Sequence, residues 1–153
     1  MVDSLVPPPF RRIGIIAGNF DVIHPGYVRF FKDAKKNACD VLTIALHVDP
    51  TIERPNKAKP ILTAEERTEI LLAIRYVDNV LYYNTEKELE ALLESISDHI
   101  RVIGTDYEDR DFTGKALAKE IYYHKRDHDW STTRYKTELT QQCIAQGLVK
   151  RDE

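Results

Sequence analysis

Short segments that are apolar almost throughout constrain the fold of this chain more than any other feature. Residues 12–18, 40–48 and 100–104 are segments of this kind, rich in isoleucine, leucine and valine. A strand that is apolar on both faces is typical of a parallel sheet, because helices cover both faces of such a sheet. Two further segments, residues 80–83 and 120–124, complete a prediction of five strands.

Helical patterns separate these strands. Residues 25–37 carry apolar side chains at helical spacing, and Pro25 suits a first helical turn. Thr63 and Glu66 have the spacing of a capping box, and the helix that follows is expected to bury Ile70 on its apolar face. Further helices are expected over residues 85–97 and 131–147. Strands that alternate with helices predict an α/β fold with a doubly wound, Rossmann-like parallel sheet of five strands, which binds ligands at the carboxyl ends of its strands.

Length and charge narrow the possible partners. A length of 153 residues fits one domain, which we assign to residues 11–147. Residues 1–10 are expected to form an extended arm, since Pro7–Pro9 prevent a helix, and residues 148–153 a polar tail. The 22 basic and 25 acidic residues give a net charge of −3, so no global basic field favours nucleic acid as a partner.

The chain has no feature of a membrane or secreted protein. It lacks an apolar run of about 18 residues, the length that a membrane-spanning helix needs. Its first residues lack the apolar stretch of a signal peptide. Its two cysteines, Cys39 and Cys143, form no disulfide framework. We therefore expect a cytoplasmic protein without a membrane partner.

The turn after the first strand, residues 18–27, is the most informative segment. It joins a buried strand to a helix N-terminus, where free N–H groups and the helix dipole attract anions. His24 adds a titratable donor there, and Gly26 disfavours the helix by about 0.8–1 kcal/mol relative to alanine, which suggests close approach of a ligand. In the alternative interpretation, His24 only caps the helix and Gly26 only relieves crowding. Neither GxGxxG nor GxxxxGK[ST] occurs, so an anion must be held in another way.

Four segments in order along the chain carry a family resemblance. Gly18-x-Phe20-Asp21-x-x-His24-Pro25-Gly26 resembles the GTFDxxHxGH signature of the HxGH nucleotidyltransferases. Three more segments resemble the glycerol-3-phosphate cytidylyltransferase branch of that family: Glu66-Arg67 with Ile74–Asp78, Gly104–Tyr107, and Trp130–Thr133. The resemblance extends from Ile13 to about Leu139 and implies the fold predicted above.

The resemblance implies that a phosphate oxygen of an acceptor attacks the α-phosphorus of CTP and that pyrophosphate leaves. It implies CTP and a small, glycerol-3-phosphate-like phosphorylated acceptor as partners, Mg²⁺ carried with the triphosphate rather than by a protein metal site, and a homodimer. The residues implied for catalysis are His24, Tyr27, Lys57, Lys59 and Arg126. Those implied for nucleotide binding are Gly18, Asn19, Phe20, Asp21, Gly26, Arg75, Gly104, Asp106, Ser131 and Thr132.

Several of these residues also have plainer explanations. The lysines and Asp106 are equally typical of solvated loops, and Ser131 of an ordinary helix cap. Arg67, beside the matched glutamate, is as consistent with an exposed helix position as with a functional one.

Two departures from the family pattern affect the functional prediction. Tyr27 stands where the signature has its second histidine. A neutral phenol in place of a charged donor weakens one hydrogen bond by about 1–2 kcal/mol, which slows turnover by roughly 5- to 30-fold. A nucleotide-binding module without catalysis therefore stays open as an alternative. An adenylyltransferase of the same fold is another, because the spacing does not fix the backbone contacts near residues 104–107 and 121–126 that select the base. Residues 126–130, Arg-Asp-His-Asp-Trp, also depart from the branch, so either the acceptor differs or His128 belongs to a solvated loop.

Overall fold

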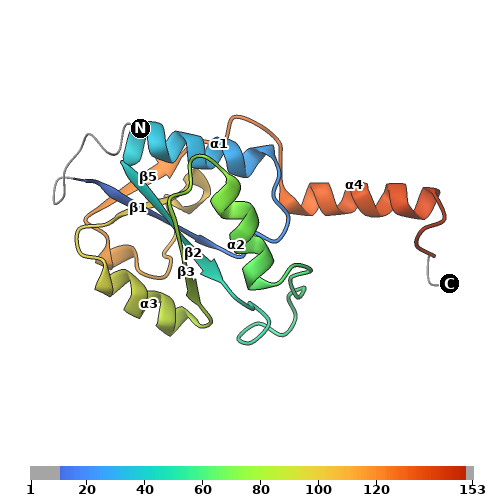
Figure 1. Ribbon diagram of the computed structural model, residues 1–153, viewed down its shortest axis with the longest axis horizontal. Coiled ribbons are helices and arrows are strands. Elements are labelled where there is room, and N and C mark those ends of the chain that lie inside the picture. Colours follow the sequence, from blue (N-terminus) through green and yellow to red (C-terminus); the bar gives the residue numbers. More distant parts are fainter. Residues whose placement is uncertain (1–10, 151–153) are drawn as a thin grey trace.

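Five parallel strands form the middle layer of the structure, a computed structural model that describes residues 11–150 (Figure 1). The strands are β1 Ile13–Gly18, β2 Val41–His47, β3 Asn79–Tyr83, β4 Ile100–Gly104 and β5 Glu120–His124. Their order is β3-β2-β1-β4-β5, which confirms the doubly wound, Rossmann-like sheet. The predicted arm, residues 1–10, and the last three residues of the predicted tail lie outside the described residues.

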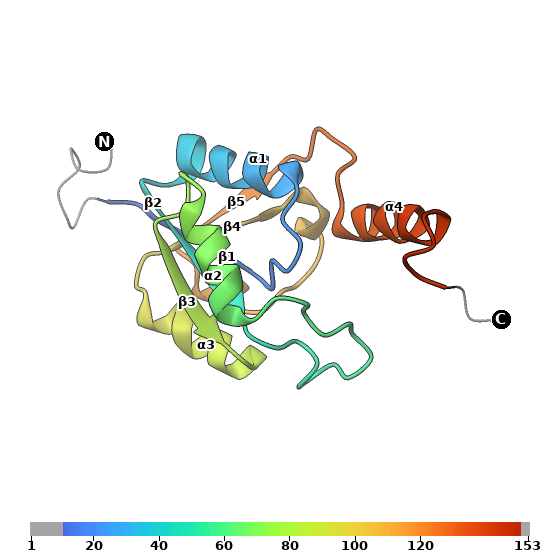
Figure 2. The same cartoon turned by 45° about the vertical axis from the view of Figure 1, so that its right-hand side comes forward.

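Within the described residues, four α-helices accompany the sheet (Figures 1 and 2). They are α1 Pro25–Asp33, α2 Ala64–Ala73, α3 Glu86–Ser95 and α4 Thr132–Ala145. A π-helical turn, Ala34–Ala38, extends α1 and completes the helix expected over residues 25–37. The capping box is formed as predicted, because the Thr63 side chain accepts a hydrogen bond from the Glu66 N–H while the Glu66 side chain accepts one from the Thr63 N–H.

Helices cover both faces of the sheet. Phe31 of α1 and Leu71 of α2 belong to one buried cluster, together with Ile16 of β1. Leu89 and Leu93 of α3 belong to a second cluster on the opposite face. The predicted apolar face of α2 is wrong in one respect: Ile70 is 41% exposed, and Arg67 is buried in line with Ala64 and Leu71. No helix within residues 11–150 is both long and apolar enough to cross a bilayer.

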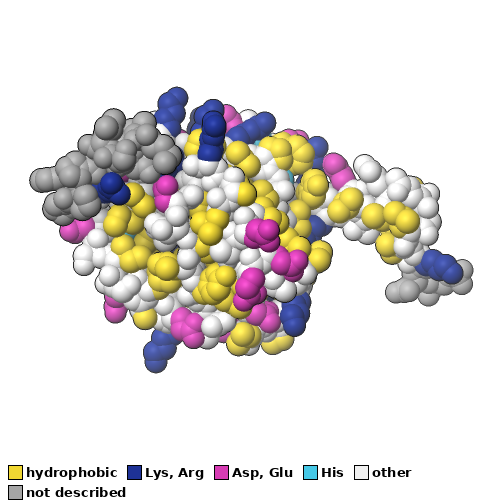
Figure 3. Space-filling view, viewed as in Figure 1, with side chains coloured by type: hydrophobic (Ala, Val, Ile, Leu, Met, Phe, Trp, Pro, Cys, Tyr) yellow, Lys and Arg dark blue, Asp and Glu magenta, His cyan; other side chains and the backbone are white. Residues whose placement is uncertain are grey.

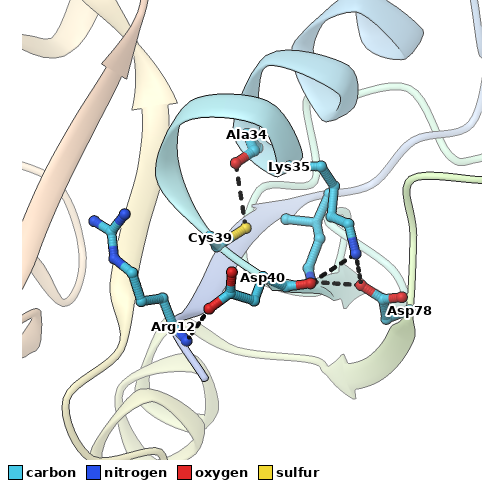
Figure 4. Close-up of polar contacts among 7 residues, drawn as sticks. Arg12, Ala34, Lys35, Cys39, Asp40 and Asp78 are labelled. Carbon is cyan, nitrogen blue, oxygen red and sulfur yellow. Dashed lines mark hydrogen bonds and ion pairs between the residues drawn. The ribbon is translucent and has the colours of Figure 1, made fainter. Parts of the chain in front are cut away.

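Polar contacts join the amino ends of the three strands β1, β2 and β3 (Figure 4). Lys35 donates to the Asp40 carbonyl at 2.7 Å and to the Asp78 carboxylate at 2.7 Å. The same carboxylate accepts from the Leu42 N–H at 2.8 Å, and the Asp40 carboxylate accepts from the Arg12 N–H at 2.8 Å. These contacts fix the strand starts and lie at the edge opposite to the one where a ligand is expected.

The carboxyl edge of the sheet is open between β1 and β4. Every residue of β1 pairs with β2, whereas β1 pairs with β4 at Gly14 and Ile15, near the start of the strand. The two strands also begin crossovers that run in opposite directions across the sheet, which is the place where doubly wound folds bind ligands.

Helix α4 projects away from the sheet (Figures 1 and 2), and all of its residues remain at least partly exposed. Tyr135 is 37% exposed and Leu139 is 51% exposed. On the face drawn in Figure 3, apolar side chains gather on this helix, while basic and acidic side chains are interspersed over the body of the protein.

Candidate functional site

A cavity of about 890 Å³ lies at the carboxyl edge of the sheet. Its walls include the ends of β1, β2, β3, β4 and β5, the N-terminus of α1, and residues 126–133 before and within α4. The sequence-predicted residues that line it are His24, Tyr27, Lys57, Arg126, Gly18, Asn19, Gly26, Gly104, Asp106, Ser131 and Thr132. The predicted edge of the sheet is therefore where the structure has its cavity.

The N-terminus of α1 holds His24 in one orientation. His24 is the N-cap, has an extended backbone, and its Nδ1 accepts a hydrogen bond from the Gly26 N–H at 3.1 Å. Because Nδ1 is the acceptor, the neutral ring carries its proton on Nε2. Burial, and then His128 and Arg126, lower the pKa of His24. The ring therefore presents an N–H donor at the positive end of the α1 dipole, where the Gly26 and Tyr27 N–H groups are bonded to His24 itself.

Tyr27 connects α1 to the start of α4. Its hydroxyl is 2.9 Å from Thr132 Oγ1 and shares a hydrogen bond with it. Its ring stacks on His24 with a centroid distance of 4.4 Å and meets Phe20 edge-on at 5.4 Å. The phenol that replaces the second histidine of the signature is thus already engaged by a protein hydroxyl.

The loop before α4 brings two further rings to His24. Trp130 stacks on it at a centroid distance of 5.9 Å and lines the cavity, so this residue belongs to the site. His128 lies over Gly26, and its Nδ1 accepts from the Trp130 N–H at 3.1 Å. The plainer explanation of Ser131 is confirmed in part, because its side chain caps α4 by accepting from the Arg134 N–H while the residue also lines the cavity.

Two predicted residues of the signature, Phe20 and Asp21, are buried and stabilise the turn. Phe20 is 3% exposed and has a φ of 47°, a left-handed conformation uncommon for a large side chain. The Asp21 carboxylate accepts from the Ile61 and Leu62 N–H groups at 2.9 Å each. Both residues therefore anchor the turn and the long loop before α2, and the structure does not place them on the cavity wall.

Arg67 is the strongest single link between these loops. It is 2% exposed, which excludes the exposed helix position considered from the sequence. Its guanidinium donates to five main-chain carbonyls, those of Asn19, His47, Val48, Leu62 and Thr63. Helical spacing from Ala64 to Leu71 was the signal in the sequence that could have revealed its burial.

The remaining predicted cations divide between the cavity and the rest of the surface. Arg126 lines the cavity 3.8 Å from the Asp106 carboxylate, with both side chains about half exposed. Lys57 also lines it, whereas Lys59 is exposed on the same loop and outside the lining. Arg75 is exposed in the turn between α2 and β3, at the opposite edge of the sheet, so the structure removes it from this site.

A second lobe of the cavity, on the α3 side of the sheet, was missed by sequence reasoning. We define the α3-side lobe as His47, Arg54, Tyr83, Glu86, Arg101, Phe112 and Thr113. Arg101 is 5% exposed, lies 5.2 Å from the centre of the Phe112 ring and donates to the Thr113 carbonyl at 2.8 Å. Its Nε is buried and has no hydrogen-bond partner among residues 11–150. Burial lowers the pKa of Arg101, while Tyr83 and Glu86 act in the opposite direction.

Glu86 and His47 complete this lobe. The Glu86 carboxylate accepts from the Thr113 hydroxyl at 2.5 Å and lies 3.6 Å from Arg54. His47 stacks on Tyr83 at 4.6 Å. Burial, and then Glu86, raise the pKa of Tyr83 to about 12, so the phenol stays protonated. These residues come from four separate parts of the chain, which is why no local motif indicated them.

Comparison with known proteins gives the family. Residues 15–138 match a family model described as cytidylyltransferase-like. The protein belongs to the cytidylyltransferase-like family. This membership confirms the nucleotidyltransferase resemblance seen in the sequence and places the cavity, with its His24 turn, in a family of nucleotidyltransferases.

The relatives of this cytidylyltransferase-like chain carry the names of different enzymes. FAD synthase of Pyrococcus abyssi is 32% identical over 112 residues, which are 72% of this chain and 73% of the relative. Bifunctional protein HldE of Aliarcobacter butzleri is 32% identical over 124 residues, 80% of this chain. The chain thus spans about a quarter of that bifunctional relative, 26% of its length.

A solved structure supports the fold. The crystal structure of the lipopolysaccharide core biosynthesis protein from Thermoplasma volcanium superposes with a TM-score of 0.60 at 20% identity, covering 79% of this chain and 99% of that one. At this identity the likeness concerns the fold.

Proposed function

We propose that the protein transfers a cytidylyl group from CTP to a small phosphorylated acceptor and releases pyrophosphate. The observation that carries this proposal is the His24 turn: an N-cap imidazole fixed by the Gly26 N–H, at the N-terminus of α1, on the wall of a cavity at the carboxyl edge of the sheet. A polyphosphate matches this site because an imidazole N–H donor and the positive end of a helix dipole both attract anions.

In the proposed reaction, an oxygen of the acceptor phosphate forms a bond to the α-phosphorus, and the bond from that phosphorus to the bridging oxygen of pyrophosphate breaks. The Nε2–H of His24 donates to polyphosphate oxygens at the positive end of the α1 dipole, and the negative charge on these oxygens grows as the bond breaks. Arg126, half exposed at the cavity mouth, binds further phosphate oxygens. The protein supplies position and charge without a covalent intermediate.

Mg²⁺ is proposed to enter with the triphosphate. The described residues contain no group of three or more His, Cys, Asp or Glu side chains placed to hold a metal ion. Such an ion neutralises charge on the phosphate oxygens. Asp106, a predicted residue on the cavity wall, is an acidic group that would contribute to the surroundings of the ion.

The α3-side lobe is proposed to receive the acceptor. Its buried Arg101 has an unused Nε–H donor, and a guanidinium binds phosphate or carboxylate oxygens well. Glu86 accepts hydrogen bonds, so the lobe suits an acceptor that combines an anionic group with hydroxyl groups. The Arg101→Met variant is expected to raise the KM for the acceptor at least 10-fold while leaving the KM for the nucleotide within 2-fold. Equal increases in both would contradict this assignment.

ATP is a second candidate for the donor, because a relative that aligns with 72% of this chain is an FAD synthase, an adenylyltransferase. The deciding experiment incubates the protein with each nucleoside triphosphate, Mg²⁺ and a panel of phosphorylated alcohols, sugars and flavin mononucleotide, and measures pyrophosphate release. Release that depends on CTP and on one acceptor supports the proposal. Release with ATP alone selects the second candidate, and nucleotide binding without release with any acceptor selects a binding module.

A further inference from the structure

Two imidazoles, and not one, face the glycine of the signature turn. A β-carbon built on Gly26 would lie 2.7 Å from His24 Cε1 and 2.8 Å from His128 Cε1. The rings of both histidines therefore rest against the same small residue, although His128 comes from the loop before α4, about a hundred residues later in the chain. Only glycine leaves room for both rings at this position.

The two histidines are oriented by the same kind of contact. His24 Nδ1 accepts from the N–H of the residue two positions later, Gly26, and His128 Nδ1 accepts from the N–H of the residue two positions later, Trp130, each at 3.1 Å. In the neutral state both rings thus carry the proton on Nε2. The site holds two imidazole N–H donors in the same tautomer.

The Nε2–H donor of His128 has no acceptor in the part of the chain that the structure describes. Its Nε2 is buried and lacks a hydrogen-bond partner among residues 11–150. Buried polar atoms are almost always hydrogen-bonded, so an unused donor on the wall of a cavity indicates a ligand that accepts from it. Tyr27, which occupies the place of the second signature histidine, has a single O–H proton and shares a hydrogen bond with Thr132, whereas the His128 donor has no such partner.

The charges around His128 favour an anion. Arg29, Arg126 and His124 act on it as positive neighbours, and Asp127 is the negative one. Burial lowers the pKa of both His24 and His128, and the nearby Arg126 lowers both further.

We propose that His128 donates its Nε2–H to the polyphosphate of the nucleoside triphosphate and so supplies, from the loop before α4, the second imidazole that α1 lacks. This inference rests on the proposed function. It assigns a binding role to a residue outside the signature and explains how an active site of this family operates with Tyr27.

The test measures binding of CTP, ATP and inorganic pyrophosphate by calorimetry in the presence of Mg²⁺. His128→Ala is expected to weaken pyrophosphate and triphosphate binding roughly 10- to 100-fold, the range for one hydrogen bond to a charged group. His128→Gln, which keeps an N–H donor near the Nε2 position, is expected to recover part of this loss. The control Lys119→Ala, on the exposed surface before β5, is expected to bind as the parent does.

Two measurements separate a ligand contact from mere filling of space over Gly26. In nitrogen-15 spectra of the histidines, pyrophosphate is expected to shift the Nε2 resonance of His128 together with that of His24. Adding Tyr27→His to His128→Ala is expected to restore binding to within about 5-fold of the parent, because an imidazole returns to the site.

Folded His128→Ala protein that binds pyrophosphate and CTP as tightly as the parent overturns the inference and leaves the proposed function standing. A parent protein that binds no nucleoside triphosphate overturns the proposed function itself, and the role of His128 with it. If His128→Ala alters the thermal midpoint but not the binding constants, the ring only fills space and the inference is again refuted.

Discussion

Replacing Arg67 is expected to disconnect the loops that form the floor of the cavity. The guanidinium is 2% exposed and reaches three carbonyls of the β1 and β2 ends, those of Asn19, His47 and Val48, at 2.6–2.9 Å. It also reaches the carbonyls of Leu62 and Thr63 at 3.1 and 3.3 Å. Methionine has a similar length and apolar stem but donates none of these bonds.

The magnitude follows from these five contacts. One hydrogen bond to a charged group contributes about 1.5–3 kcal/mol, but bonds that share one side chain are not additive. We therefore expect Arg67→Met to lower the free energy of unfolding by about 3–5 kcal/mol, a large part of the 5–15 kcal/mol typical of a domain. For a domain of this size that corresponds to a fall in Tm of about 6–20 °C.

The assay is thermal and urea unfolding followed by circular dichroism, with Arg75→Met as a matched control. Arg75 is exposed at the other edge of the sheet, so the control is expected to change stability by less than about 0.5 kcal/mol. Arg67→Lys keeps a charge but lacks the planar fork, and its stability is expected to fall between the parent and Arg67→Met. An Arg67→Met protein within 1 kcal/mol of the parent would refute the role assigned to these carbonyl contacts.

Three further predictions concern the site and the core. His24→Ala is expected to lose most pyrophosphate release, whereas Tyr27→His retains or raises it; equal rates for His24→Ala and the parent would contradict the site. The pKa values of His24 and His128 are lowered below the ordinary 6.5, so below pH 6.5 the unfolded chain binds protons that the folded one does not. The urea midpoint of unfolding should therefore fall from pH 7 to pH 5.5 and stay level above pH 7. The fall should be smaller in a variant in which both histidines are replaced by glutamine. A fall of equal size in that variant argues against the two histidines as its source. Burial raises the pKa of Cys39 to about 11, so iodoacetamide at pH 8 should alkylate Cys143 and leave Cys39 intact in peptide mass spectra, and early alkylation of Cys39 would show that its thiol is accessible.

Local chemistry explains which parts of the fold could be predicted. The Thr63 and Glu66 capping box and the apolar strands depend on residues within a few positions of one another, so the chain order alone predicts them. The turn from Gly18 to Gly26 is local as well, and its place on the cavity wall follows from the α/β topology.

The parts that could not be predicted depend on contacts between distant segments. Arg101 and Glu86 come together in the α3-side lobe because both are hydrogen-bonded to Thr113, and neither residue lies in a recognisable motif. The prediction for Arg75 failed for a different reason. Its segment resembles the family, which suggested a place in the site, yet the turn before β3 lies at the amino edge of the sheet, away from the cavity. The hydrogen bond of the Tyr27 hydroxyl is shared with Thr132, 105 positions away in the sequence. The position of Tyr27 in the signature could not predict this partner.

Helix α4 is attached to the rest of the protein near its first turn, and the remainder of the helix projects freely. Its first turn is held by Tyr27 through Thr132, while its 14 residues extend about 21 Å beyond that point. A tilt of about 10° at the base sweeps the far end through about 4 Å by simple trigonometry on that length. A small rotation of the first turn of α4 beside the cavity would therefore displace the far end of the helix by several times as much. Cys143 lies near that end, and its thiol offers a place for a spectroscopic label that would detect the displacement.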